Sequence, residues 1–75
     1  GIVVSVKNKI ISISSSKESI DEVLIFNVLG QEIFNKKKIN NAQLQISNLQ
    51  TGNQVLLVKT ILQNGYTSTK KVIFH

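Results

Sequence analysis

Short segments of alternating apolar and polar residues, separated by turn residues, limit what this chain can fold into. In the first segment, residues 2–6, Ile2, Val4 and Val6 share one face. Glycine, asparagine or a polar run interrupts the alternation about every 6–12 residues. No segment repeats apolar residues at the i, i+3, i+4, i+7 spacing over three helical turns. The sequence therefore predicts strands throughout.

Seven strands are predicted, at residues 2–6, 9–14, 21–29, 31–36, 43–47, 53–62 and 66–74. In the longest of them Lys59 should face water, which places Leu56, Val58 and Thr60 toward the core. Gly30 predicts a tight turn with positive φ, and the pair Asn64-Gly65 predicts a type I′ hairpin turn. The expected fold is all-β, a seven-stranded antiparallel immunoglobulin-like β-sandwich.

The segment at residues 21–29 is the most apolar part of the chain. Four large apolar residues follow one another in it, namely Val23, Leu24, Ile25 and Phe26, so both faces of the predicted strand are apolar. This pattern is typical of a central strand, or of a strand whose second face meets a partner.

Length and charge narrow the classes of protein further. The chain has 75 residues, enough for one domain, and no cysteine. Its net charge is +5, and its basic side chains are all lysines. Lysine lacks the planar guanidinium group with which arginine contacts phosphate and guanine in a bidentate manner. We therefore expect solubility rather than nucleic-acid binding. The lysine run at residues 36–38 is interpreted as a solvated turn or as protection of an edge strand.

Residues for catalysis or metal binding are scarce. The only histidine is His75, and the acids Glu18, Asp21 and Glu22 lack the turn glycine and the additional oxygen ligands of a calcium loop. The chain also lacks the cysteine and histidine residues that a zinc site needs. We expect no catalytic residues, no cofactor and no metal, hence no enzyme.

No targeting or membrane-spanning segment is visible. The longest apolar runs fall far short of the ~20 residues that cross a bilayer, and no charged n-region precedes an apolar stretch. Because the chain begins with Gly1, we expect residues 1–75 to be a single domain excised from a larger secreted protein.

Three pieces of sequence, in order, resemble the type A C-terminal sorting domain of type IX secretion cargo. The first is Val-Leu-Ile-Phe-Asn-Val-Leu-Gly-Gln-Glu-Ile at residues 23–33, and the second is Leu-Gln-Thr-Gly at 49–52 with the strand after it. The third is Asn64-Gly65 followed by Thr-Lys-Lys-Val-Ile at 69–73. The chain departs from the family at Gln54, where a tyrosine is frequent, and at His75.

The resemblance implies a non-catalytic secretion signal of Bacteroidota. Its partners would be the type IX outer-membrane translocon, a sortase-like protease and an N-terminal cargo domain in the same parent chain, with no nucleic acid and no membrane insertion. The cargo would pass through the periplasm and reach the cell surface or the medium. The expected recognition residues are Gly30, Gly52, Lys70, Lys71, Val72 and Ile73. The alternative function is an adhesion or carbohydrate-binding accessory module of a secreted protein.

Overall fold

The computed structural model describes all 75 residues and contains seven strands and no helix. The strands are β1 (Ile2–Lys7), β2 (Ile10–Ser15), β3 (Ile20–Asn27), β4 (Glu32–Lys36), β5 (Gln43–Ile46), β6 (Gln54–Leu62) and β7 (Thr67–Phe74). Each corresponds to one of the seven strands predicted from the sequence. No helix is present that is long and apolar enough to cross a membrane.

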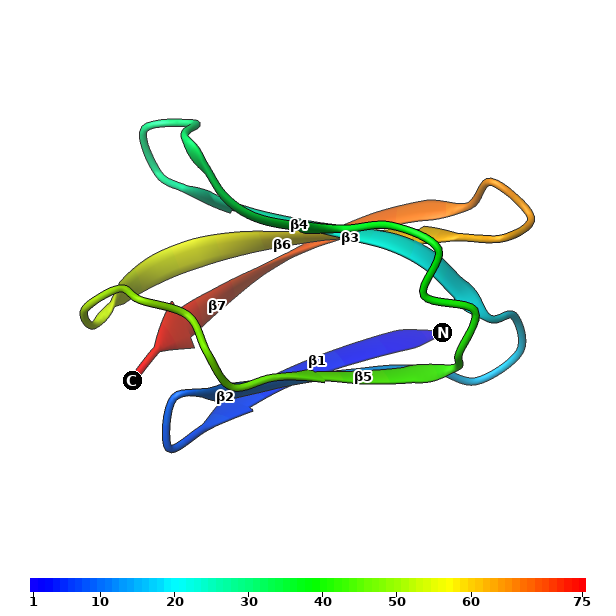
Figure 1. Cartoon of the computed structure of the whole chain (residues 1–75), viewed down its shortest axis with the longest axis horizontal. Helices are drawn as coiled ribbons and strands as arrows, with labels where there is room; N and C mark the ends of the chain where they lie inside the picture. Colours follow the sequence, from blue (N-terminus) through cyan, green and yellow to red (C-terminus); the bar gives the residue numbers. More distant parts are fainter.

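The strands form two antiparallel sheets that pack face to face (Figure 1). The smaller sheet has the order β1-β2-β5 and the larger sheet has the order β4-β3-β6-β7. Every pairing within the two sheets is antiparallel. The prediction of an all-β chain with antiparallel sheets is therefore confirmed.

The core lies between the sheets and is built from the inward-facing side chains of both. In β6, Leu56, Val58 and Thr60 are fully buried, as the position of Lys59 predicted. Alternation along the strands selects which apolar residues enter this layer. The buried apolar residues are Ile2, Ile11, Ile13, Ile20, Val23, Ile25, Ile46, Leu56, Val58, Leu62 and Phe74.

The prediction of a type I′ turn at Asn64-Gly65 is wrong. Only Gly65 has positive φ there (92°), and its N–H donates to the carbonyl of Leu62 at 2.9 Å. Leu62 in turn donates to the carbonyl of Tyr66 at 2.8 Å, which leaves a three-residue loop with glycine in the left-handed position. The two-residue turn with positive φ at both positions lies instead at Asn8 (51°) and Lys9 (61°), between β1 and β2.

The predicted strand at residues 21–29 ends earlier than expected. β3 stops at Asn27, whose carbonyl accepts a hydrogen bond from the Gly30 N–H at 3.0 Å. Asn27 also donates to the carbonyl of Gln31, so the residues between them form a second three-residue loop. Gly30 has the predicted positive φ (83°). Val28 and Leu29 are therefore exposed at the hairpin tip and are not part of a strand.

Candidate recognition surface

Three of the predicted recognition elements lie at one end of the sandwich. The β3–β4 turn with Gly30, the β5–β6 loop with Gly52 and the end of β7 with Ile73 all appear on the left of Figure 1. The register agrees, because Asn27 pairs with Leu56 and Phe74 pairs with Gln54. Lys70 and Lys71 lie away from this end of the sandwich, in the middle of β7.

The side chain of Asn27 holds the turn that carries Gly30. Its Oδ1 accepts hydrogen bonds from the N–H groups of Leu29 and Gln31, both at 3.0 Å. Its Nδ2 donates to Oε1 of Gln31 at 2.7 Å. An asparagine that bonds the backbone two residues on is a common way to fix a turn. The exposed side chains of Val28 and Leu29 are thus presented on an ordered tip.

Gly52 differs from Gly30 in its structural role. Its φ is not positive, and a Cβ added to it meets no atom within 4 Å. The loop around it is held by a hydrogen bond between the Gln54 Nε2 and Thr51 Oγ1 atoms. The backbone at residue 52 therefore does not require glycine.

The four predicted residues in β7 do not share one face. Val72 is partly buried and packs against the core cluster. Lys70 alternates to the same side as Val72 but is exposed. Lys71 and Ile73 point the other way, to the outer face of the larger sheet, where Ile73 is 66% exposed. The structure thus separates Val72 and Lys70 from the outward-facing pair.

One end of the outer face of the larger sheet is apolar. Since Leu56 and Val58 are buried, Val55 and Leu57 face outward. Val55 lies opposite Ile73, and Leu57 lies between Phe26 and Lys71. We call Phe26, Val55, Leu57 and Ile73, together with the tip residues Val28 and Leu29, the outer apolar patch.

The smaller sheet has a different outer face. Ser5, Ser12 and Gln45 follow one another across its three strands, and Ser14 and Gln43 form part of the next row. Val3 (62% exposed) and, less so, Ile10 (36%) are the exposed large apolar residues on this face. Polar outward positions are the ordinary condition of a solvated antiparallel sheet. The contrast marks the larger sheet as the face suited to contact another molecule.

Sequence reasoning found part of this patch. The apolar segment at 21–29 indicated a possible partner, and the Gly30 hairpin and Ile73 were expected to take part in recognition, but Val55 and Leu57 were not assigned to the surface. The same sequence pattern could have identified Val55 and Leu57, because Val-Leu-Leu-Val at 55–58 also predicts a strand that is apolar on both faces.

The acidic residues remain scattered. Glu18 is exposed in the β2–β3 loop, whereas Asp21 and Glu22 are partly buried in β3. No group of three or more His, Cys, Asp or Glu side chains is placed to hold a metal ion. His75, the only histidine, contributes its backbone carbonyl, which accepts a hydrogen bond from the Lys9 N–H.

Residues 1–74 match the family model described as a domain of unknown function, DUF8694, and the chain belongs to this family. The match covers all seven strands. No curated protein matches the chain.

Proposed function

We propose that this domain is a non-catalytic C-terminal sorting signal, recognised by a type IX outer-membrane translocon. It directs a cargo domain of the same parent chain from the periplasm to the cell surface or the medium, and a sortase-like protease removes it. The proposal includes an immunoglobulin-like topology in a variant form: the fourth strand pairs with the third, whereas in the constant-type immunoglobulin domain it pairs with the fifth.

The outer apolar patch is the observation that carries this proposal. It unites three sequence pieces: the β3–β4 hairpin tip, the start of β6 after the Gly52 loop, and the end of β7. Each of these pieces bears the sequence resemblance to type IX sorting domains. Three patch residues, Val28, Leu29 and Ile73, are well exposed and the other three are partly buried. Exposed apolar patches are characteristic of surfaces that bind other proteins. Lys71 lies at the border of the patch and adds a positive charge.

A reporter fusion tests the proposal. Residues 1–75 are placed behind a reporter with a signal peptide, in a type IX-competent strain, and the reporter is measured in periplasm, cell surface and medium. We expect export to the surface or medium. Reporter that stays in the periplasm, with the domain folded, would contradict the proposal.

Two matched variants of this fusion test the patch itself. Ile73→Lys places a charge in the patch, whereas Val3→Lys places one on the outer face of the smaller sheet at similar exposure (66% and 62%). We expect Ile73→Lys to retain the reporter in the periplasm and Val3→Lys to export it normally. Equal export of both variants would remove the role assigned to the patch.

One observation favours the alternative, a carbohydrate-binding module. Tyr66 is 59% exposed and lines a hollow of ≈380 Å³ at the opposite end of the sandwich, together with Glu18 and Asn64. A ring beside polar groups is a common way to bind a sugar. A glycan array decides this function: specific hits that disappear in Tyr66→Ala would support it over the sorting role.

A further inference from the structure

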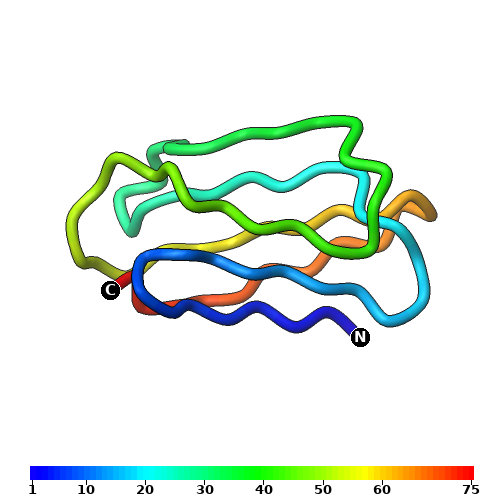
Figure 2. Tube along the Cα trace, turned by 60° about the horizontal axis from the view of Figure 1, so that its bottom comes forward, coloured from blue at the N-terminus to red at the C-terminus, as the bar shows by residue number.

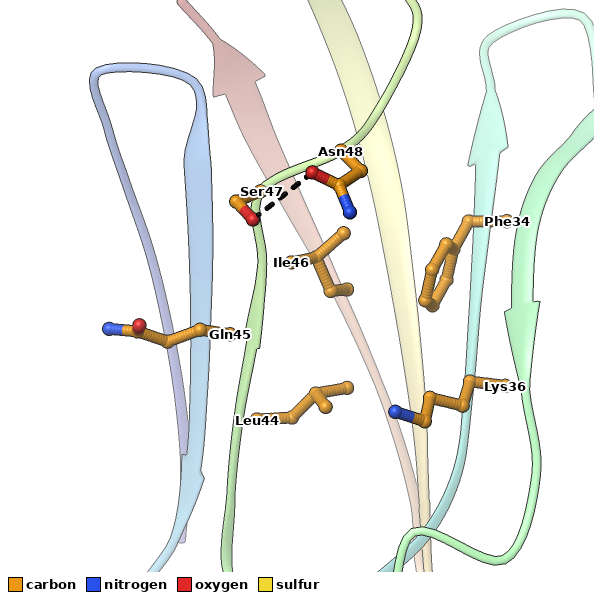
Figure 3. A pocket seen from close by; sticks show the side chains of 7 residues that line it. All are labelled: Phe34, Lys36, Leu44, Gln45, Ile46, Ser47 and Asn48. Carbon is orange, nitrogen blue, oxygen red and sulfur yellow. Dashed lines mark hydrogen bonds between the residues drawn. The ribbon is translucent and has the colours of Figure 1, made fainter.

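A groove lies between β4 and β5, the neighbouring edge strands of the two sheets. Its volume is ≈190 Å³. Phe34 and Lys36 of β4 line one side, and Leu44 and Ile46 of β5 line the other (Figure 3). Gln45 also borders the groove, but its side chain points away from it in Figure 3. Ser47 and Asn48 complete the lining, so the groove combines apolar side chains with polar ones.

The outer edge of β5 is unpaired. Ser15 donates its N–H to the carbonyl of Ala42 at 2.8 Å, and antiparallel pairing alternates from there. Leu44 and Ile46 consequently direct their backbone groups to β2, whereas Gln43 and Gln45 direct theirs to the groove side.

One of the outward backbone groups of β5 already has a partner. The N–H of Gln43 donates to Oδ1 of Asn41 at 3.0 Å. The N–H and carbonyl of Gln45 have no partner strand, because β5 ends the sheet. An edge strand in this condition is ready to pair with another extended chain.

The two edges of the groove are protected to different degrees. β4 ends in Lys36, two more lysines follow it, and its pairing with β3 shifts register between Ile25 and Phe26. Lysines and such irregularities discourage strand addition. β5 has the sequence Gln-Leu-Gln-Ile, without charge, proline or a register shift. Strand addition at this groove therefore favours β5.

Charge indicates which segment fits. The ammonium group of Lys36 points across the groove toward Leu44 (Figure 3), where a carboxylate on an incoming strand would meet it. Phe34 and Leu44, which are only partly buried, offer apolar contacts to a neighbouring side chain. A second copy of this chain is a poor occupant because each copy carries a net charge of +5.

We propose that the groove binds an extended peptide segment that pairs with the free edge of β5. Its inward side chains, two residues apart, are an apolar residue against Phe34 and an acidic residue against Lys36. Main-chain pairing supplies affinity, and the two side chains supply specificity. This site is separate from the outer apolar patch and does not depend on the sorting role.

Titration of the ¹⁵N-labelled full chain with the capped peptide Thr-Val-Thr-Glu-Thr-Val tests the proposal by NMR. We expect amide shift changes confined to β4 and to residues 43–48. Replacing the glutamate by lysine should weaken binding about five-fold or more. Equal binding of the two peptides, changes centred on β1 and β7, or no binding up to about 5 mM peptide would overturn the proposal.

Two pairs of protein variants locate the contacts. Gln45→Pro removes an N–H that β2 does not use and should abolish binding, whereas Gln45→Ala keeps the N–H and should bind normally. Lys36→Gln should reduce the preference for glutamate, whereas Lys71→Gln, on the outer face, should not. If Gln45→Pro does not fold, the proposal is tested by comparing Lys36→Gln with Lys71→Gln and by comparing the glutamate peptide with the lysine peptide. Concentration-dependent shifts of residues 43–47 without peptide would assign the edge to a second copy and overturn the proposal.

Discussion

The backbone N–H of Lys9 donates a hydrogen bond of 2.6 Å to the backbone carbonyl of His75. These residues belong to different sheets: Lys9 lies in the β1–β2 turn and His75 follows β7. Figure 2 shows the C-terminus beside that turn. Next to His75, Phe74 is fully buried between the sheets. The end of β7 is therefore anchored on both sides, in contrast to the usual fraying of a terminal residue.

The first prediction concerns this anchor. Phe74→Ala should lower the free energy of unfolding by about 3–5 kcal/mol, because it empties a fully buried position. The control Ile73→Ala, at an exposed position, should change it by about 0.5 kcal/mol or less. Urea denaturation followed by circular dichroism measures both. Similar losses in the two variants would contradict the packing described for β7.

Gly30 and Gly52 should respond differently to alanine. Neither position has an atom within 4 Å of an added Cβ, so only the backbone conformation distinguishes them. Gly30→Ala should cost about 1 kcal/mol because φ is +83°. Gly52→Ala should be neutral or stabilise slightly, by reducing the freedom of the unfolded chain. Thermal unfolding of both variants provides the measurement, and a larger loss at Gly52 would contradict the loop geometry.

Thr60 offers a route to higher stability. Its Oγ1 is buried without a hydrogen-bond partner, and its side chain is fully buried in β6. Thr60→Val keeps the shape and removes the unpaired hydroxyl, so the free energy of unfolding should rise by about 1 kcal/mol. Thr69→Val, at an exposed position in β7, is the control and should have a smaller effect. A loss of stability in Thr60→Val would show that the hydroxyl has a partner.

The β1–β2 turn can also be improved. Lys9 has φ of +61° without being glycine, and it follows Asn8 at 51°. Lys9→Gly creates the Asn-Gly pair preferred in two-residue hairpin turns and should stabilise the domain by about 0.5–1 kcal/mol. The change keeps the N–H that bonds His75. Lys7→Gly, inside β1, should destabilise instead, and chemical denaturation of both variants gives the comparison.

The alternation of residues was sufficient to locate every strand, because burial on one face imposes a period of two. The geometry of the turns was harder to predict from the sequence. Asn64-Gly65 resembles a two-residue turn in sequence, yet the register of Leu62 with Tyr66 leaves three residues in the loop. The sequence does not state that register, which depends on how β6 and β7 pair along their whole length.

The recognition surfaces depend on pairing between distant strands. Lys71 and Ile73 were predicted from the resemblance, but their separation from Val72 follows from which face of β7 meets the core. The groove between Phe34 and Leu44 exists because β4 joins β3 and β5 joins β2, so the two strands end different sheets. No local pattern encodes that choice.

The pairing of β3 with β6 has a consequence for how the chain is made. Ile20 lies opposite Leu62, and Phe74 fills the last space between the sheets. A chain that ends before β6 therefore leaves β3 with β4 as its only partner strand. Such a product exposes one edge of its central strand, so truncated chains should pair with other chains and aggregate more readily than the complete domain.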